Sequence, residues 1–421
     1  MRNILSTILL AAAFMASGCA NKPSSSGSGE ITPPEKKAVE MTLEGTHLRS
    51  SSADPCIVYY NGLFYFTMTG ASNLFMVVDK DLSRLSASAH PISSDGIFYR
   101  SANDPTVEEL FGKGATIDGT WSPEIHYFSE EDCPGNAGWY LVFALRMQSD
   151  EGSAYVRPVV MKSLGRSPSG PYGNPVSGIE GESQRFLDAN GNPFTDWAIG
   201  VSYLRIPTGR YKGIYATWVD EVGRGEGYGN FYQRLRIARL SKPWQIASEA
   251  ATITTPTQDW EKKGASAKLP MVVEGGTAVY GEHGEIFMTY CGSGYWSDYG
   301  QGQLTLAMEG DDYADPLQES SWIKYAGNPV FSSAQSDDLR GAGHVFFFND
   351  PVGNRYVCYH AYPYSNGVKQ SLRNAYMEPF SIDYDAKEET APQGVLRFGL
   401  NRNGVTAPVQ SRITWWYQRP N

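Results

Sequence analysis

Between residues 46 and 421, the order of apolar and polar positions indicates short strands rather than long helices. No long amphipathic helical period is evident there. A glycine-containing turn followed by an aromatic, β-branched strand recurs instead. The five copies read NGLFYFTMTG, AGWYLVFAL, TGRYKGIYATW, HGEIFMTYC and VGNRYVCYH. Their turn glycines, separated by 76, 71, 75 and 69 residues, are Gly62, Gly138, Gly209, Gly284 and Gly353.

This even spacing predicts an all-β protein, a five-bladed β-propeller over residues 46–421, with one antiparallel sheet per copy. A β-sandwich is the alternative, but its turns would be closer together and less regular. Because the innermost strands of a propeller converge on one axis, residues far apart in sequence can share a site there. Trp415 and Trp416, near the end of the chain, indicate a last strand that could close the ring.

Polar residues stand at similar places in the copies, shortly before the turn. Three of them, each 8 to 10 positions before the turn glycine, are Asp54, Glu274 and His344. The corresponding stretch of the second copy, TWSPEIHYF, contains Trp121, Glu124 and His126. We expect these positions to face one another across the central channel.

Two carboxylates in a pocket with aromatic walls are what hydrolysis of a glycosidic bond requires. One must stay ionised to activate water, and the other must carry a proton for the leaving sugar. Asp54, held by Pro55, suits the base, and Glu274 suits the acid because the apolar run Met271–Val273 precedes it. Candidate platforms for a sugar ring are Trp121, Trp197 and Trp296. Taken singly, each residue also has a plainer reading as a turn, a cap or a core side chain.

The composition of the chain limits the classes of partner that it is expected to bind. The chain has 421 residues and a net charge of -10, which argues against nucleic acid or an anionic membrane surface and fits a neutral ligand. Cys56, Cys133, Cys291 and Cys358 are far apart and show no zinc-ligand spacing, so a structural zinc site is not expected. We expect a monomer that binds an oligosaccharide or polysaccharide.

The N-terminus reads as an export signal. Arg2 precedes an apolar run, Ile4–Met15, that is too short to span a bilayer, and small residues lead into Cys19. This resembles a bacterial lipoprotein signal over residues 1–18, with Cys19 as the lipidated residue and membrane contact through that lipid alone. Ordinary secretion is the alternative. Residues 19–45 are rich in Ser, Gly and Pro and predict a flexible tether.

Read in order, the motifs resemble those of glycoside hydrolase family 43 over roughly residues 50–385. They include ADPCIVYYNGLFYF, TWSPEIHYF, DWAIG, VVEGGTAVYGEHGEIFMTYCGSG, GAGHVFFF and RNAYMEPFSIDYD. The resemblance implies a five-bladed propeller, an inverting mechanism and substrates such as arabinan, arabinoxylan or xylan. It implies Asp54 as general base and Glu274 as general acid. Arg373 matches an arginine that follows the last blade of relatives.

The resemblance also places His344 on the channel axis, where many relatives hold a calcium ion, often through water. Calcium prefers oxygen ligands, so His344 would only assist such a site. The alternative is a histidine that fills the channel and bonds to water. We therefore list calcium as the one candidate cofactor, with His344 as its metal-binding residue.

The chain departs from the family at two glycines. Gly200, in DWAIG, stands where the family carries a third carboxylate that tunes the acid, and Gly276 replaces a usual proline. Asp196 is four residues away, about 13 Å along an extended strand. It would need a bulge or a turn to take that place. The sequence therefore leaves open whether another group tunes the acid.

Three functions fit these residues. The first is an exported glycosidase of the α-L-arabinofuranosidase or β-xylosidase type, with activity reduced by the missing carboxylate. The second is a carbohydrate-binding propeller without turnover. The third, a retaining fructan-active propeller, fits worst because NDPT around Asn103 is a poor match to the nucleophile motif it needs.

Overall fold

The five copies fold into five antiparallel sheets, each with its innermost strand followed outward by the next strands in sequence. The computed structural model describes residues 37–42, 47–85, 96–151, 153–332, 338–350, 355–398 and 412–417. The predicted signal, residues 1–18, and Cys19 lie outside the described residues, as does Gly353.

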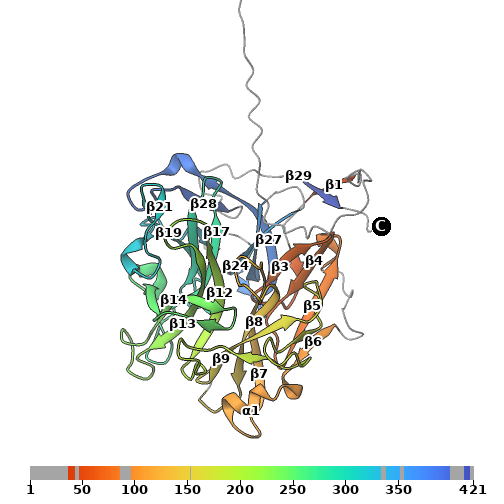
Figure 1. Cartoon of the computed structure of the whole chain (residues 1–421). Coiled ribbons are helices and arrows are strands. Elements are labelled where there is room, and N and C mark those ends of the chain that lie inside the picture. Colours follow the sequence, from red (N-terminus) through yellow and green to blue (C-terminus); the bar gives the residue numbers. More distant parts are fainter. Residues whose placement is uncertain are drawn as a thin grey trace, which may run out of the picture. The chain divides into compact units, whose positions relative to one another are not determined.

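The first two blades follow one another in the chain (Figure 1). The first contains β3 (Cys56–Tyr60), β4 (Leu63–Thr67), β5 (Asn73–Asp79) and β6 (Ile97–Arg100). The second contains β7 (Ile117–Phe128), β8 (Gly138–Met147), β9 (Val156–Ser163), β10 (Tyr172–Gly173) and β11 (Gln184–Arg185). The α-helix in the described residues, α1 (Thr106–Phe111), lies between these blades in the sequence.

The next two blades repeat the arrangement. The third contains β12 (Ala198–Ile206), β13 (Gly213–Val222), β14 (Tyr232–Lys242), β15 (Gln245–Ile246) and β16 (Ala251–Thr254). The fourth contains β17 (Val273–Tyr280), β18 (Ile286–Gly292), β19 (Gly300–Leu306), β22 (Trp322–Lys324) and β23 (Phe331–Ser332). Short elements complete the described chain: η1 (Leu82–Arg84), η2 (Ser101–Asn103), η3 (Asp259–Lys262), β20 (Met308–Glu309), β21 (Asp312–Tyr313), η4 (Glu319–Ser321) and η6 (Tyr384–Ala386).

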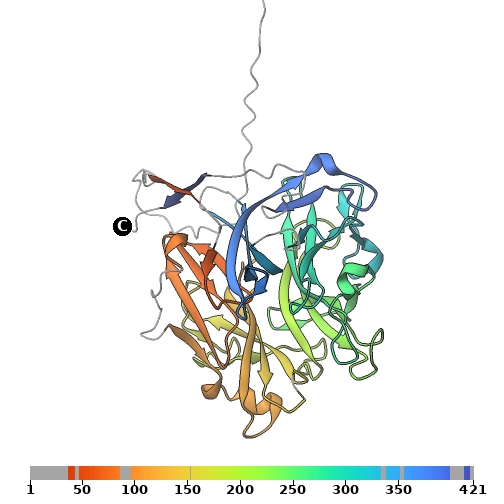
Figure 2. The ribbon, with the colours of Figure 1, turned by 180° about the vertical axis from the view of Figure 1, so that it is seen from behind.

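The fifth blade joins the two ends of the ring. It contains β24 (Leu339–Asn349), β25 (Arg355–Ser365), β26 (Val368–Lys369), β27 (Asn374–Asp383) and β28 (Val395–Phe398). Its sheet also includes β2 (His47–Arg49), which pairs with β27 (Figure 2). The expectation that the C-terminal tryptophans close the ring is therefore wrong: β29 (Arg412–Tyr417) pairs with β1 (Lys37–Thr42), within the predicted tether, and an N-terminal strand closes the propeller.

Contacts between innermost strands complete the circle. β3 contacts β7, β7 contacts β12, β12 contacts β17, β17 contacts β24, and β24 contacts β3. The five-bladed propeller is thus confirmed. Gly62, Gly209 and Gly284 lie in the turns between the first two strands of their blades, and Gly138 begins β8. All four have positive φ, which glycine adopts readily.

The hydrophobic core lies between blades because both faces of each sheet are covered by a neighbour. Strands such as β8, β18 and β19 are therefore buried over nearly their whole length. Large rings fill these layers, and the fully buried ones include Phe64, Phe143, Phe186, Tyr290 and Tyr359. None of the helices in the described chain is both long and apolar enough for a membrane span.

Candidate functional site

At or just before each innermost strand, one residue in the left-handed region occupies the same structural position. These residues are Asp54 (φ 50°), Ser122 (φ 50°), Gly200 (φ 60°), Gly275 (φ 62°) and His344 (φ 53°). In every blade the regular pairing with the second strand resumes two residues later. A non-glycine residue with such a φ is strained, and strain of this kind gathers at functional sites. The bulges mark a ring of equivalent positions around the channel.

Asp54 is buried and has three nitrogen-bearing neighbours from the fifth blade. Its Oδ1 lies 3.0 Å from His360 Nδ1, 3.5 Å from Arg373 Nη1 and 3.6 Å from His344 Nδ1. Thr69 donates a hydrogen bond to its Oδ2. Burial alone would raise the pKa of Asp54, but the charges of His344 and Arg373 and the hydrogen bond from His360 outweigh it and hold the pKa well below its usual range. Asp54 is therefore an ionised carboxylate.

Glu274, in β17, has the opposite environment. Its Oε1 accepts a hydrogen bond from the Tyr299 hydroxyl at 2.8 Å. Enclosure in the channel raises the pKa of Glu274. His344 and the hydrogen bond from Tyr299 act against burial without outweighing it, and the negative charge of Asp54 adds a smaller increase. The two predicted carboxylates thus differ in the sense that acid–base catalysis requires.

The structure brings Asp54, Glu274, His344 and Arg373 together, because His344 and Arg373 act electrostatically on both carboxylates. Ring closure fixes this arrangement. The Ser52 amide donates to the Arg373 carbonyl at 2.8 Å, which ties the segment before Asp54 to the segment before β27. The strand pairing that completes the fold also aligns the site.

Sequence reasoning missed four members of this cluster. They are Thr69 and His360, which contact Asp54, Tyr299, which contacts Glu274, and Tyr295, whose ring lies 4.6 Å below the Arg373 guanidinium. His360 had a signal, since it is the polar residue within the otherwise apolar run YVCYHAY, and it is fully buried. Burial lowers the pKa of His360 to about 3, so its ring is neutral beside Asp54.

Among the predicted sugar platforms, Trp296 contacts this cluster. It packs against Tyr299, donates from Nε1 to the Gly264 carbonyl at 2.9 Å, and meets Tyr295 edge-on at 5.1 Å between centroids. Tyr295 is 39% exposed, so it offers an accessible ring at the rim of the site.

Trp121 occupies in β7 the position that Glu274 occupies in β17, one residue before the left-handed residue. Its ring lies 5.2 Å from the Arg146 guanidinium. Trp197 is turned elsewhere: its Nε1 donates to the Ser153 carbonyl at 2.8 Å, and its ring packs in the layer between the third and fourth blades.

Glu124 and His126 form a pair of their own on β7, with His126 Nε2 2.7 Å from Glu124 Oε2. The His126 ring packs edge-on against Tyr203 and Phe346. Both residues therefore fill the space between innermost strands, and their described partners do not include Asp54 or Glu274.

Gly200 lies beside the acid. A Cβ built on it would be 3.7 Å from the backbone nitrogen of Gly275, the residue after Glu274. Asp196 is directed elsewhere, because it lines a hollow of about 450 Å³ together with Trp197, Asp220 and Arg234, and its charge acts on Arg157. Gly276 is packed closely, since a Cβ there would lie 2.6 Å from Leu235.

The donors around His344 fit calcium poorly. Among the described residues, no group of three or more His, Cys, Asp or Glu side chains is arranged to hold a metal ion. The neighbours of His344 are two carboxylates, Asp54 and Glu274, a second imidazole and a guanidinium, whereas calcium takes six to eight oxygens. A calcium ion held through water stays a prediction.

The four cysteines of the propeller are buried free thiols. Asp104, in the NDPT stretch of the fructan alternative, is also buried, and it accepts bonds from the Thr106 amide at 3.0 Å and the Tyr99 hydroxyl at 2.9 Å. It organises the start of α1, which is a structural role.

The fold and its two unlike carboxylates define a class: a five-bladed propeller equipped for acid–base chemistry at its channel. The model of the glycosyl hydrolases family 43 matches residues 47–387. The chain therefore belongs to that family, as the motifs predicted.

Individual relatives agree with this assignment. The alpha-L-arabinofuranosidase B of Pyricularia oryzae is 26% identical over 76% of this chain and 57% of that protein. An extracellular exo-alpha-(1->5)-L-arabinofuranosidase of Streptomyces avermitilis is 24% identical over 75% of this chain and 55% of its own length. The chain thus spans little more than half the length of these curated relatives.

Solved structures support the fold. The crystal structure of an alpha-L-arabinofuranosidase from Lactobacillus brevis has a TM-score of 0.60 at 24% identity, covering 84% of this chain and 95% of that one. A thermostable family-43 glycoside hydrolase has a TM-score of 0.59 at 18% identity, covering 90% and 100%.

Proposed function

We propose that this protein hydrolyses a glycosidic bond with inversion at the anomeric carbon, with Asp54 as general base and Glu274 as general acid. The observation that carries the proposal is the contrast between them. His344, Arg373 and a hydrogen bond from His360 keep the Asp54 carboxylate ionised, and the enclosed Glu274 keeps its proton more readily.

The reaction needs one water molecule. Asp54 accepts a proton from the water, whose oxygen forms a bond to the anomeric carbon. The bond from that carbon to the leaving oxygen breaks, and Glu274 gives its proton to this oxygen. Water must fit between the carboxyls, which inverting enzymes keep about 6.5–9.5 Å apart.

For the substrate we propose pentose-containing plant polysaccharides, such as arabinan, arabinoxylan or xylan. The support comes from the relatives, two of which are named as α-L-arabinofuranosidases. Tyr295 and Trp296 would contact the apolar face of the sugar, with Arg373 beside Asp54 at its hydroxyl groups.

Aryl α-L-arabinofuranosides and aryl β-D-xylosides test the proposal. The parent protein should release sugar from one of them, and proton NMR taken early in the reaction should show the inverted anomer first. Asp54→Asn should reduce kcat by about 10²–10⁴-fold in protein that circular dichroism shows to be folded. Equal turnover by Asp54→Asn and the parent would exclude Asp54 as the base, and the retained anomer would exclude the mechanism.

A second candidate is a propeller that binds carbohydrate without turnover. Gly200 favours it, since this position next to Glu274 carries no carboxylate. Calorimetry with arabino- and xylo-oligosaccharides separates the two functions. Binding without any released sugar, over a range of pH and substrates, would select the binding protein.

We also propose export and lipid attachment at Cys19, based on the residues that precede it. One relative is named as extracellular, which agrees with export. Expression in a bacterium with labelled palmitate tests both points. A labelled, membrane-bound product that becomes soluble and unlabelled in Cys19→Ala supports the anchor, and an unlabelled secreted product supports ordinary secretion.

A further inference from the structure

The third blade contains a hollow that the proposed reaction does not use. Its volume is about 450 Å³, and it is lined by the connection between β11 and β12, by β13 and β14, and by the segment between β15 and β16. Sites for small ligands typically have about 300–1,000 Å³ and combine apolar walls with a few fixed polar groups. The hollow has the size of such a site, so its lining decides what it can bind.

The hollow lies at the end of the third blade that contributes to the ring of left-handed residues around the channel. Ala198, the first residue of β12, lines the hollow and is two residues before Gly200, about 7 Å along the strand. Asp220 is opposite Ala198 on β13, and Arg234 is opposite Asp220 on β14. Because these residues share one end of the sheet with Gly200, one sugar chain can reach both the channel and the hollow.

Aromatic side chains form the apolar side of the hollow. The rings of Phe194 and Trp218 meet at 5.3 Å between centroids, with an angle of 67° between their planes. Trp218 is only 4% exposed, yet its indole nitrogen has no hydrogen-bond partner among the described residues. A buried indole N–H usually has such a partner. Trp218 therefore offers both a ring and a free hydrogen-bond donor to a ligand in the hollow.

A carboxylate and two guanidinium groups form the polar side. Asp220 Oδ1 accepts a hydrogen bond from Arg234 Nε at 2.6 Å, and its Oδ2 accepts from Arg234 Nη2 and Arg236 Nη1, both at 3.1 Å. Arg236 also donates to the carbonyls of Ala250 and Ala251 at 2.7 Å and 3.1 Å. Within the described chain, Nη1 of Arg234 has no partner. A free donor of Arg234 thus lies beside the acceptor oxygens of Asp220, an arrangement that can bind neighbouring hydroxyl groups.

The charges in the lining favour a neutral ligand over an anion. Two guanidinium groups alone would suggest a phosphate or carboxylate ligand, but Asp220 and two backbone carbonyls already accept from most of their nitrogens. The lining also contains more acidic than basic side chains: Asp188, Asp196, Asp220 and Glu249 against Arg234 and Arg236. An anion would meet a net negative charge there, whereas the hydroxyl groups of a neutral sugar would find donors and acceptors.

We propose that the hollow is a second carbohydrate-binding site, which holds neutral pentose units of the polysaccharide chain away from the bond that is cleaved. Phe194 and Trp218 contact the ring of the sugar, and Asp220 and Arg234 bind its hydroxyl groups. The identity of the sugar rests on the proposed function. A chain held in both the channel and the hollow is bound more tightly than by either alone, whereas an aryl glycoside occupies the channel only.

Fluorine NMR of protein labelled with 5-fluorotryptophan tests binding in the hollow without requiring turnover. Glu274→Gln serves as the starting protein so that oligosaccharides stay intact, and the Trp218 signal is assigned by its loss in Trp218→Phe. Arabinohexaose or xylohexaose should shift the Trp218 signal in a saturable way. A xylo-oligosaccharide that carries glucuronic acid should bind more weakly, because the lining is acidic.

Thr195→Arg is the variant that blocks the hollow, since Thr195 is exposed and lines it. Its matched control is Thr208→Arg, because Thr208 is an exposed threonine in the turn between β12 and β13, at the opposite end of the same blade. Thr195→Arg should abolish the shift of the Trp218 signal. With the Glu274 carboxyl intact, it should lower the ratio of kcat/KM on polysaccharide to kcat/KM on an aryl glycoside by about tenfold. Thr208→Arg should change neither readout.

A Trp218 signal that saturating arabinohexaose and xylohexaose leave in place would overturn the inference. So would equal shifts in Thr195→Arg and Thr208→Arg, which would mean that the signal responds to binding elsewhere. Tighter binding of the glucuronic acid derivative would overturn the assignment to neutral sugars.

Should Thr195→Arg fail to fold, Arg234→Met decides in its place. Arg236 still pairs with Asp220 in that variant, and loss of the Arg234 donors should weaken oligosaccharide binding by about five- to tenfold. Unchanged binding in Arg234→Met would then overturn the inference. A saturable Trp218 shift in a protein that hydrolyses no glycoside would leave the second site standing and reject only the proposed function.

Discussion

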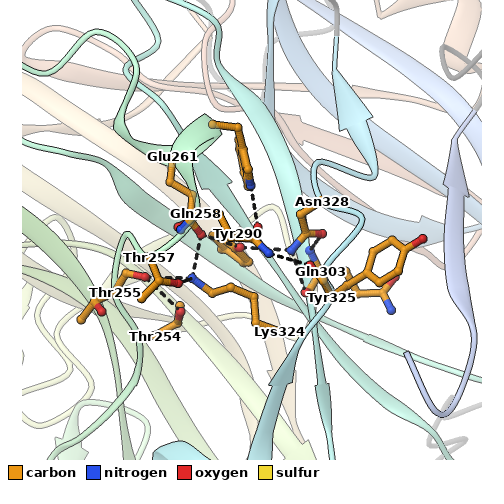
Figure 3. Close-up of polar contacts among 11 residues, drawn as sticks. Thr254, Thr255, Thr257, Gln258, Glu261, Tyr290, Gln303, Lys324, Tyr325 and Asn328 are labelled. Atoms are coloured by element: carbon orange, nitrogen blue, oxygen red, sulfur yellow. Dashed lines mark hydrogen bonds and ion pairs between the residues drawn. The ribbon is translucent and has the colours of Figure 1, made fainter. Parts of the chain in front are cut away.

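Two glutamates of the fourth-blade region have the same hydrogen bond but different charged neighbours. Oε1 of Glu274 accepts from Tyr299 at 2.8 Å, and Oε1 of Glu261 accepts from Tyr290 at 2.7 Å. Glu261, in η3, is 0% exposed and also contacts Lys324 Nζ at 2.7 Å (Figure 3). In the part of the chain that the structure describes, no ion pair joins Glu274 to a cation.

Both carboxylate oxygens of Glu261 have hydrogen-bond or ion-pair partners. Lys324 donates also to the Thr255 carbonyl and the Thr257 hydroxyl, and the second oxygen of Glu261 accepts from the Gln258 amide (Figure 3). A charge compensated this fully holds the loop before β17 in place. Glu274 keeps partial exposure and lacks a direct cation, so its proton is available for transfer. The structural Glu261 differs from the reactive Glu274 mainly because a cation compensates its charge, and less because of its burial.

The largest effect should come from exchanging the carboxyl for an amide at each position. Glu274→Gln should lower kcat by about 10²–10⁴-fold on substrates with poor leaving groups, since the leaving oxygen then lacks a proton donor. Substrates with dinitrophenyl leaving groups should lose little. Glu261→Gln should leave kcat of the folded protein unchanged. Steady-state kinetics with both substrate types checks this, and equal losses for both variants would remove the distinction.

Removing the cation Lys324 should destabilise only the region around Glu261. Lys324→Met leaves the Glu261 charge buried without its partner, so the free energy of unfolding should fall by about 3–5 kcal/mol. Denaturant unfolding measures it. Adding Glu261→Gln should recover part of the loss, because no uncompensated charge then remains. A loss that the double variant does not reduce would show that Lys324 contributes packing rather than charge compensation.

The fold and the place of Glu274 could be predicted from the sequence because the blades repeat, whereas Glu261 was not among the predicted residues. Gly62, Gly138, Gly209 and Gly284 recur because each blade needs the same turn, which made the propeller and the clustering of Asp54, Glu274 and His344 predictable. The structure places Asp54 and His344 at the left-handed position but Glu274 one residue before it. The closure of the ring by β2 could not be predicted, since nothing in the short run His47–Arg49 identifies its partner hundreds of residues away.

Side chains that tune the site were harder to find than those that react. His360 lies on β25, the second strand of its blade, and Tyr299 lies directly before β19, the third strand of its blade. Their roles depend on which side chain faces which across a sheet, and a one-residue change in register would reverse that. Asp196 was considered as a substitute carboxylate because it is near Gly200 in sequence, but in the structure it lines a hollow with Asp220 and Arg234.

Glu221, near the end of β13, extends the comparison between Glu261 and Glu274. Its side chain is only 6% exposed and pairs with a cation, Arg224, that is itself 38% exposed. Its pKa is raised from about 4.5 to about 7 by burial, so the folded protein binds this proton more tightly than the unfolded chain. Its stabilising contribution is complete below about pH 4.3 and is lost as the pH rises to about 7. Relative to Glu221→Gln, the parent should therefore lose on the order of 1–3 kcal/mol over this interval.

Thermal unfolding of the parent and Glu221→Gln between pH 4 and pH 8 measures this difference in stability. Glu226→Gln is the control, because Glu226 is an exposed glutamate. The contribution of Asp54 to stability has the opposite pH dependence. Because its pKa is lowered, it stabilises the folded protein above about pH 3.9, and this contribution is lost in acid. A difference that stays constant between pH 4 and pH 8 would mean that Arg224 compensates Glu221 as fully as Lys324 compensates Glu261.

The smallest effect should come from deleting each tyrosine hydroxyl. Tyr290→Phe removes one of several bonds to Glu261 and should cost about 1 kcal/mol of stability, without changing the pH profile. Tyr299→Phe removes a hydrogen bond that lowers the pKa of Glu274. The alkaline limb of kcat/KM should therefore move to higher pH, with a stability loss of similar size. Kinetics over pH 4–9 and denaturant unfolding of both variants separate the two outcomes. A shift of the pH profile in Tyr290→Phe, or none in Tyr299→Phe, would show that the hydroxyl bonds do not distinguish the reactive glutamate from the structural one.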